Sequence, residues 1–135
     1  MKRNSGFSFI DIVVVTAIIA LLASVAIPSY NSQMQKTRRA EGQAKLLEVM
    51  HAQAKHYREN STYVTDLRIL GYDAATEKSA NEFYTVTASS CETGINQCVK
   101  LTANANLEQM ADGSLTLDSV GRKERVLSNG TVRNW

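Results

Sequence analysis

Few side chains in this sequence have the types and spacing that chemistry requires, and two cysteines are the clearest of them. Cys91 and Cys98 enclose six residues, one of which is Gly94. An even number of cysteines in a chain expected to leave the cytoplasm predicts a disulfide, which loop entropy makes worth roughly 2.5 kcal/mol. Thiolate ligation of a metal ion is the alternative. It lacks partners, because there is no other cysteine and neither histidine is near in sequence.

The spacing of the two histidines does not indicate a metal site either. His51 and His56 are five residues apart, which places them about 140° apart around a helix instead of on one face. The sequence contains no phosphate-binding loop, dinucleotide fingerprint or nucleophile elbow. These observations predict a protein that is not an enzyme and that has neither a cofactor nor a metal ion.

A group of cations near the C-terminus could bind a polyanion or another protein. Arg122, Lys123 and Arg125, followed by Arg133, could contact DNA phosphates or a neighbouring subunit. Glu124 interrupts them and no aromatic stacking pattern accompanies them, so a solvated strand edge is the alternative. Bulk charge does not favour DNA, because the net charge of +2 resides in the first three residues and the rest of the chain is neutral.

The elements that position these groups begin with a long apolar segment. Residues 7–27 read FSFIDIVVVTAIIALLASVAI and contain one charge, Asp11. As a helix this segment would span roughly 32 Å, about the thickness of a bilayer core. Lys2 and Arg3 precede it and place the start of the chain in the cytoplasm. A cleaved secretory signal is the alternative, but such signals are shorter and do not need an aspartate, which is costly in lipid unless paired.

The start of the chain also resembles a known family. Gly6-Phe7-Ser8-Phe9-Ile10-Asp11 is similar to the prepilin signature of type IV pilins and pseudopilins, and residues 26–30 (AIPSY) match as well. The resemblance implies that a prepilin peptidase cleaves between Gly6 and Phe7 and methylates Phe7 to N-methylphenylalanine. The leader, residues 1–6, would then remain in the cytoplasm.

Two residues of the apolar segment have roles in assembly by the same resemblance. Asp11 stands where the family has glutamate, which implies a pair with the terminal amine of a neighbouring subunit. Aspartate is one methylene shorter, and a tolerated substitution facing lipid headgroups is the alternative. Pro28 cannot donate to the Ser24 carbonyl, so we expect a kink or local unwinding near residues 24–28 that helps subunits to pack.

An amphipathic helix is expected to continue from the apolar segment to about residue 60. Apolar residues recur at spacings of three or four, which predicts that this face packs on a sheet: Ala40, Ala44, Leu47, Met50, Ala54 and Tyr57. Three cations, Lys36, Arg38 and Arg39, are expected just outside the membrane, where they meet lipid phosphates, acidic neighbours or solvent. Thr65 is predicted to cap a short turn that ends at Gly71.

Beyond residue 82 the hydrophobic period changes to two. Residues 83–88, 98–103 and 115–118 alternate and are rich in β-formers, and a charged edge strand is plausible at residues 122–127. The fold class is therefore α+β: a long N-terminal helix, half membrane-spanning and half amphipathic, packed on an antiparallel sheet of three or four strands. The expected divisions are a leader 1–6, an assembly helix 7–28, an amphipathic continuation 29–60 and a globular part 61–135.

The resemblance implies a structural subunit of a type IV pilus, a minor pilin, that primes assembly or supports adhesion, twitching motility or DNA uptake. Its partners would be other pilin subunits, the prepilin peptidase and the assembly machinery of the inner membrane. The protein would be stored there with its globular part in the periplasm before it enters the pilus. A pseudopilin of type II secretion is the alternative, but no clear run of calcium ligands follows Asp112 and Asp118.

Overall fold

The computed structural model describes residues 8–135. The chain divides into two compact units, one that ends at Met34 and one, here called the head, that comprises Gln35–Trp135. A single helix, α1 (Phe9–Asn60), contributes to both. The predicted divisions at residues 28 and 60 separate segments by their expected environment, and they stay a prediction.

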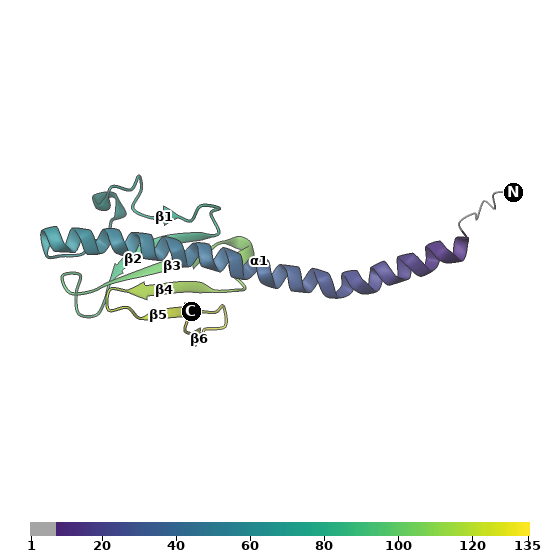
Figure 1. Cartoon of the computed structure of the whole chain (residues 1–135). Coiled ribbons are helices and arrows are strands. Elements are labelled where there is room, and N and C mark those ends of the chain that lie inside the picture. The colour runs from purple at the N-terminus through teal and green to yellow at the C-terminus, as the bar shows by residue number, and fades with distance from the viewer. Residues whose placement is uncertain (1–7) are drawn as a thin grey trace. The chain divides into compact units, whose positions relative to one another are not determined.

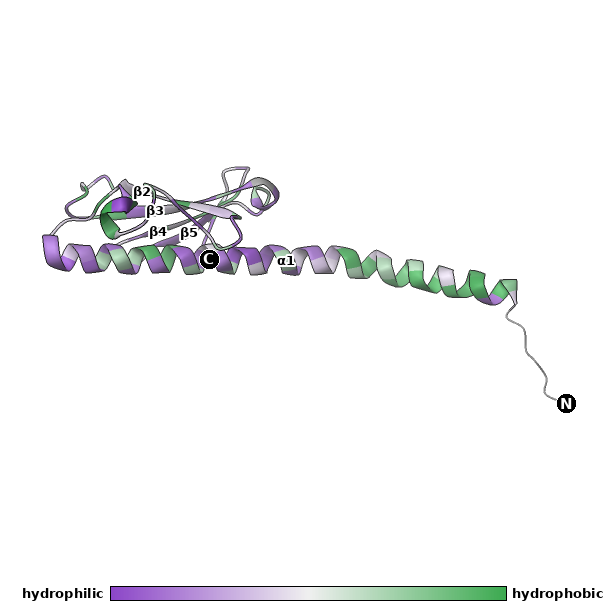
Figure 2. Cartoon of the chain, turned by 90° about the horizontal axis from the view of Figure 1, so that it is seen from above, coloured by the Kyte–Doolittle hydropathy of each residue, from purple (hydrophilic) through white to green (hydrophobic). Residues whose placement is uncertain are grey.

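The helix α1 is 52 residues long and runs through Pro28 as one continuous element. The expected local unwinding near residues 24–28 is therefore wrong, whereas the alternative, a kink at Pro28, stays a prediction. Proline removes one main-chain hydrogen bond, and the bonds of the adjacent turns suffice to keep the helix in register. The hydropathy of α1 changes along its length, from strongly hydrophobic near its start to polar where it enters the head (Figure 2).

The head consists of the second half of α1 and an antiparallel sheet whose six strands follow each other in sequence order. Both ribbon views show α1 running along one face of this sheet (Figures 1 and 2). The strands are β1 (Glu77–Lys78), β2 (Tyr84–Ser90), β3 (Val99–Ala105), β4 (Ser114–Asp118), β5 (Lys123–Val126) and β6 (Val132–Arg133). The α+β class is confirmed, and four of these strands match the predicted segments. The other two have two residues each, too few for an alternating pattern to be recognised.

The face of α1 that packs on the sheet is not the predicted one. Its buried residues are Gly42, Leu46, Val49 and Gln53, and the sheet opposes them with Val86, Leu101, Ala103, Leu115 and Leu117. Of the predicted face only Met50 is partly buried, while Ala40, Ala44, Leu47, Ala54 and Tyr57 are exposed. The helix thus has two apolar faces, roughly 120° apart at 100° per residue, and sequence period alone does not tell them apart.

Two contacts explain why the sheet packs on the face of α1 that contains Gly42. A Cβ at Gly42 would lie 2.7 Å from Cδ2 of Tyr84, so only glycine lets this buried ring approach the helix. Gln53 is buried but satisfied, because its side chain donates to Val64 O at 2.6 Å and accepts from Val64 N at 3.1 Å. These two bonds fasten the chain that leaves α1 to the side of the helix.

The connection after α1 contains the short 3₁₀ helix η1 (Leu67–Leu70). Its cap is Asp66 instead of the predicted Thr65, because the Asp66 carboxylate accepts the N–H of Arg68 at 3.0 Å. Gly71 ends η1 as predicted, in a left-handed conformation with φ of 95°.

The C-terminal segment is fixed to the head by pairing and by packing. Strand β5 is not an edge, because β6 pairs with it through Arg125 opposite Arg133 and Val126 opposite Val132. The indole N–H of Trp135 donates to Thr116 O at 3.0 Å, and the ring packs against the core. The C-terminal segment is therefore held in place by strand pairing and packing, without a disulfide bond.

Candidate functional site

The first turn of α1 contains the acidic residue singled out in the sequence. The cleavage site predicted between Gly6 and Phe7 lies outside the described residues. Asp11 accepts the N–H of Ser8 on its Oδ2 atom at 3.1 Å, and its own N–H donates to Ser8 O at 3.0 Å. The carboxylate thus caps the helix of its own chain. The short aspartate side chain suits this local contact, and pairing with another subunit stays a prediction.

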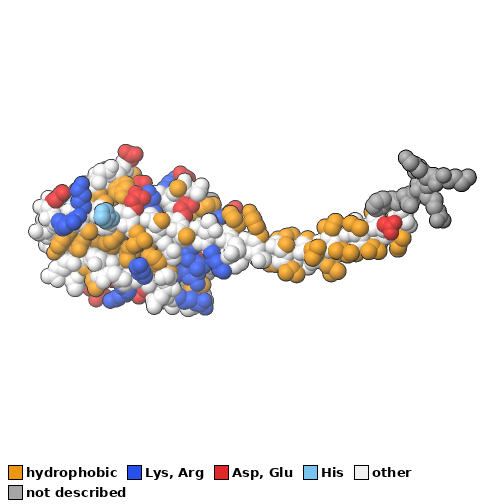
Figure 3. Space-filling view, in the orientation of Figure 1, with side chains coloured by type: hydrophobic (Ala, Val, Ile, Leu, Met, Phe, Trp, Pro, Cys, Tyr) orange, Lys and Arg blue, Asp and Glu red, His pale blue; other side chains and the backbone are white. Residues whose placement is uncertain are grey.

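The apolar part of α1 is exposed along its length. All of its large hydrophobic residues are accessible, among them Phe9 at 81%, Leu21 at 71% and Val25 at 71%, and they cover this part of the surface in Figure 3. Its hydroxyl groups are satisfied internally, because Thr16 donates to Ile12 O and Val13 O, and Ser24 donates to Leu21 O. By length and composition this helix can cross a membrane.

A buried carboxylate in the head joins α1 to strand β5 of the sheet. Asp112 has a side chain that is 6% exposed and forms ion pairs with Arg39 of α1 and Arg125 of β5. The Arg39 Nε–H donates to Asp112 Oδ2 at 2.7 Å, and Arg125 Nη1 donates to Oδ1 at 3.2 Å. Gln109 Nε2 donates to the same carboxylate and to Gln35 O, both at 3.0 Å. We call Asp112, Arg39, Arg125 and Gln109 the Asp112 hub.

The electrostatics of the Asp112 hub affect its neighbours. The hydrogen bond that the Arg39 guanidinium donates to Asp112 raises the pKa of that guanidinium. Burial raises the pKa of the adjacent Tyr84 to about 12, so its hydroxyl stays protonated at any physiological pH. The neighbouring Arg38 pairs with Glu108 at 2.9 Å and lies 4.2 Å from the centre of the Phe83 ring. Arg38 and Arg39 therefore pair with acidic residues of the head itself, and a contact of these cations with lipid or another subunit stays a prediction.

Strand alternation separates Arg122 from the other two cations that the sequence placed in one candidate contact. Arg125 lies in the Asp112 hub with a side chain that is 13% exposed. The Lys123 Nζ atom lies over the Trp135 ring, 5.1 Å from the ring centre. Arg122 precedes β5 and is 71% exposed, with a weak ion pair to Asp118 at 3.8 Å. Of the three, Arg122 offers the most accessible charge for a ligand.

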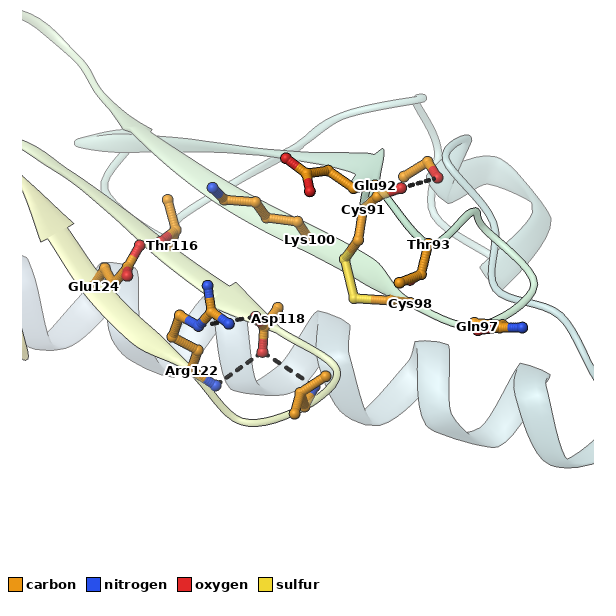
Figure 4. A pocket seen from close by; sticks show the side chains of 12 residues that line it. Cys91, Glu92, Thr93, Gln97, Cys98, Lys100, Thr116, Asp118, Arg122 and Glu124 are labelled. Atoms are coloured by element: carbon orange, nitrogen blue, oxygen red, sulfur yellow. Dashed lines mark hydrogen bonds and ion pairs between the residues drawn. A yellow bond between two sulfur atoms is a disulfide. The ribbon is translucent and has the colours of Figure 1, made fainter.

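Arg122 lines an open groove of about 640 Å³ on the head (Figure 4). One wall is the β2–β3 loop with Glu92 and Thr93, and the other is the turn between β4 and β5. Lys100 of β3 and Glu124 of β5 also line the groove. Within residues 8–135, the side chain of Lys100 forms no hydrogen bond or ion pair.

The disulfide predicted between Cys91 and Cys98 is present, with the two Cα atoms 5.4 Å apart. Both cysteines line the groove. The loop between them is further held by hydrogen bonds from Gly94 N to Cys91 O and from Cys98 N to Gly94 O, both at 3.0 Å. The disulfide therefore staples the β2–β3 connection and fixes one wall of the groove. Among residues 8–135, no three His, Cys, Asp or Glu side chains are grouped to hold a metal ion.

Two features of these sites were missed in the sequence. In the sequence Asp112 stands out only as an acid that lacks a run of calcium ligands, whereas its partners Arg39 and Arg125 lie 73 and 13 residues away. No local signal identifies such a contact. Lys100 falls within the predicted strand at residues 98–103, and its place in the groove follows from the β3–β4 register, in which Lys100 faces Asp118.

The sequence matches known proteins over much of its length. Residues 28–117, which are 90 of the 135 residues, match the family described as type IV minor pilin ComP, DNA uptake sequence receptor. The chain is also 30% identical over 92 residues to the type IV major pilin protein PilA of Myxococcus xanthus (strain DK1622). That similarity covers 67% of this chain and 41% of PilA, so the chain spans about two fifths of the length of this relative.

The Asp112 hub leads to a prediction about stability. Asp112→Asn keeps the shape of the side chain but leaves the guanidinium groups of Arg39 and Arg125 without a counter-charge. We expect a loss of about 3 kcal/mol in the free energy of unfolding, measured by denaturation of the detergent-solubilised chain followed by Trp135 fluorescence. Asp118→Asn is the matched control, because its partner Arg122 is exposed, and it should cost less than about 1 kcal/mol. Equal losses in the two variants would contradict a central role for the hub.

Proposed function

The chain belongs to the ComP family of type IV minor pilins, and from this premise we propose that it is a filament subunit that assembles through α1 and contributes to DNA uptake. Pilins of this family are structural proteins that are anchored in a membrane and then associate with a pilus. The finer steps are part of the proposal: cleavage between Gly6 and Phe7 by a prepilin peptidase, methylation of Phe7, and storage in the inner membrane with the head in the periplasm. We propose no enzymatic activity. The family does not favour a type II secretion pseudopilin.

The observation that carries the assembly function is the unpartnered apolar surface at the start of α1. Twelve large hydrophobic residues between Phe9 and Ile27 are each at least 44% exposed. Moving them out of water is worth on the order of 20 kcal/mol at about 1.5–2 kcal/mol per side chain. A bilayer supplies this environment before assembly, and the helices of neighbouring subunits supply it afterwards. A protein that moves between the two needs an anchor that packs equally well against lipid and against helices.

The second apolar face of α1 supports the same function inside the head. Ala40, Ala44, Leu47 and Ala54 lie on one exposed face of α1, with Leu47 48% exposed. Three of the four are alanine, and small residues let another helix approach closely. We therefore place a contact with the helix of a neighbouring pilin subunit on this face, opposite the one that packs on the sheet.

DNA uptake is the second part of the proposal, and the groove supports it. The matched family is described as a DNA uptake sequence receptor. Lys100 and Arg122 line the groove from β3 and from the start of β5. Their accessible charges can bind phosphate groups, whereas Arg125 is neutralised within the Asp112 hub and Lys123 is engaged with Trp135. Of the three cations predicted from the sequence, the proposed contact therefore retains only Arg122. Lys100 takes the place of Lys123 and Arg125.

Assembly is tested with the exposed face of α1. Leu47→Arg places a charge in the proposed helix contact but faces water in the isolated head, so the fold should be unaffected. We expect the fraction of this variant in sheared pili to fall at least about tenfold relative to the membrane fraction, because burial of an unpaired cation is costly. Leu47→Met, which conserves volume and polarity, should assemble normally. Normal incorporation of the arginine variant would show that this face of α1 is not part of the interface between subunits.

The DNA contact is tested by neutralising its two cations. The variant Lys100→Gln/Arg122→Gln should bind short duplexes roughly tenfold more weakly at low salt, and the slope of log Kd against log salt should fall by about two. The measurement is fluorescence anisotropy with the full chain in detergent. Lys36→Gln/Lys55→Gln removes the same charge from exposed positions of α1 outside the groove and serves as control. If both double variants lose affinity alike, the groove is not the contact.

A further inference from the structure

The groove that contains Lys100 and Arg122 has two rigid walls. The disulfide and the internal hydrogen bonds of residues 91–98 hold the first wall. In the second, the Asp118 carboxylate accepts the N–H groups of Val120 at 3.1 Å and of Arg122 at 2.8 Å. The backbone from which side chains project into the groove is therefore held in place before any ligand arrives.

The groove contains more acidic than basic side chains. Its cations are Lys100 and Arg122, and its acids are Glu92, Asp118 and Glu124. Asp118 is occupied by Arg122 and by two backbone N–H groups. Glu92 and Glu124 differ, because in the part of the chain that the structure describes neither side chain forms a hydrogen bond or an ion pair. Figure 4 shows Glu92 at the β2–β3 side of the groove and Glu124 at the β4–β5 side.

Two free carboxylates are unfavourable in a surface that serves only to hold phosphate groups. Each repels a DNA backbone that approaches Lys100 and Arg122, so the general, sequence-independent attraction is largely cancelled. A carboxylate has a different use at a base edge, because it can accept a hydrogen bond from the N4 amino group that cytosine presents in the major groove. Specific recognition often combines such an attractive contact with repulsion of wrong partners.

We propose that Glu92 and Glu124 are specificity-determining residues of this groove, which accept hydrogen bonds from cytosine amino groups of a fitting duplex and repel the backbone of other duplexes. This inference rests on the proposed DNA contact of Lys100 and Arg122. The cations position the duplex on the head, and the two carboxylates select its sequence. The rigid backbone of the walls serves this selection, because it limits the positions that the two carboxylates can reach.

The test uses the full chain in detergent and a pool of short labelled duplexes with a randomised central segment. Wild-type protein should bind the unselected pool weakly and enrich a motif that contains C·G pairs through rounds of selection. Glu92→Gln/Glu124→Gln should bind the unselected pool about threefold to tenfold more tightly at low salt, since two repulsive charges are removed. The same variant should lose most of the enrichment for C·G pairs, because a glutamine amide both donates and accepts and therefore suits adenine better than cytosine. Circular dichroism and a thermal melt verify that the variant is folded.

The control variant Glu59→Gln/Asp73→Asn removes two exposed acids that do not line the groove. It should behave as wild type in both affinity and enrichment. If Glu92→Gln/Glu124→Gln has wild-type pool affinity and enriches the same motif, or behaves like the control, the two carboxylates do not determine specificity although DNA binding stands. If neither wild type nor any variant binds the pool at low salt, the proposed DNA contact itself is wrong.

Discussion

The apolar surface at the start of α1, which has no packing partner among residues 8–135, is the constraint on which the rest of the structure depends. No soluble fold can leave so many large hydrophobic side chains in water, so this segment requires lipid or other helices. The same helix must then enter a head that folds in water. Its polarity changes along its length accordingly, and its internal hydroxyl bonds keep the apolar part free of unsatisfied polar groups.

The head meets this constraint by attaching α1 to the sheet on one face only. Gly42 lets the Tyr84 ring come close, Leu46 and Val49 supply apolar contact, and Gln53 holds the chain that leaves the helix. The Asp112 hub adds a polar contact between helix α1 and strand β5, which are far apart in sequence. The opposite face of α1 stays exposed and available to another subunit. The groove lies elsewhere on the head and is shaped by loops, so assembly and DNA contact do not compete for the same residues.

Much of this organisation could be predicted from the sequence, and the rest depends on contacts that no local pattern encodes. The apolar segment, the alternation in β2, β3 and β4, and the Cys91–Cys98 pair are local signals, and each was interpreted correctly. The packing face of α1 was not, because a helix that contacts a sheet and a neighbour has two apolar faces with the same period. The Asp112 hub joins residues up to 73 positions apart, and β1 and β6 are too short to show a pattern. The groove could not be predicted without the β3–β4 register, which places Lys100 opposite Asp118.

We propose that this chain is a pilin whose leader is cleaved off and whose apolar helix then passes from the membrane into the filament. The most direct measurement is the intact mass of the protein extracted from the membranes of its native host. The account predicts a chain that begins at Phe7, is one methyl group heavier than the sequence from that residue, and is two hydrogens lighter because of the disulfide. A chain that begins near Ile27, or one that retains Met1 to Gly6, would contradict it and would indicate a secreted protein or a simple membrane-anchored domain.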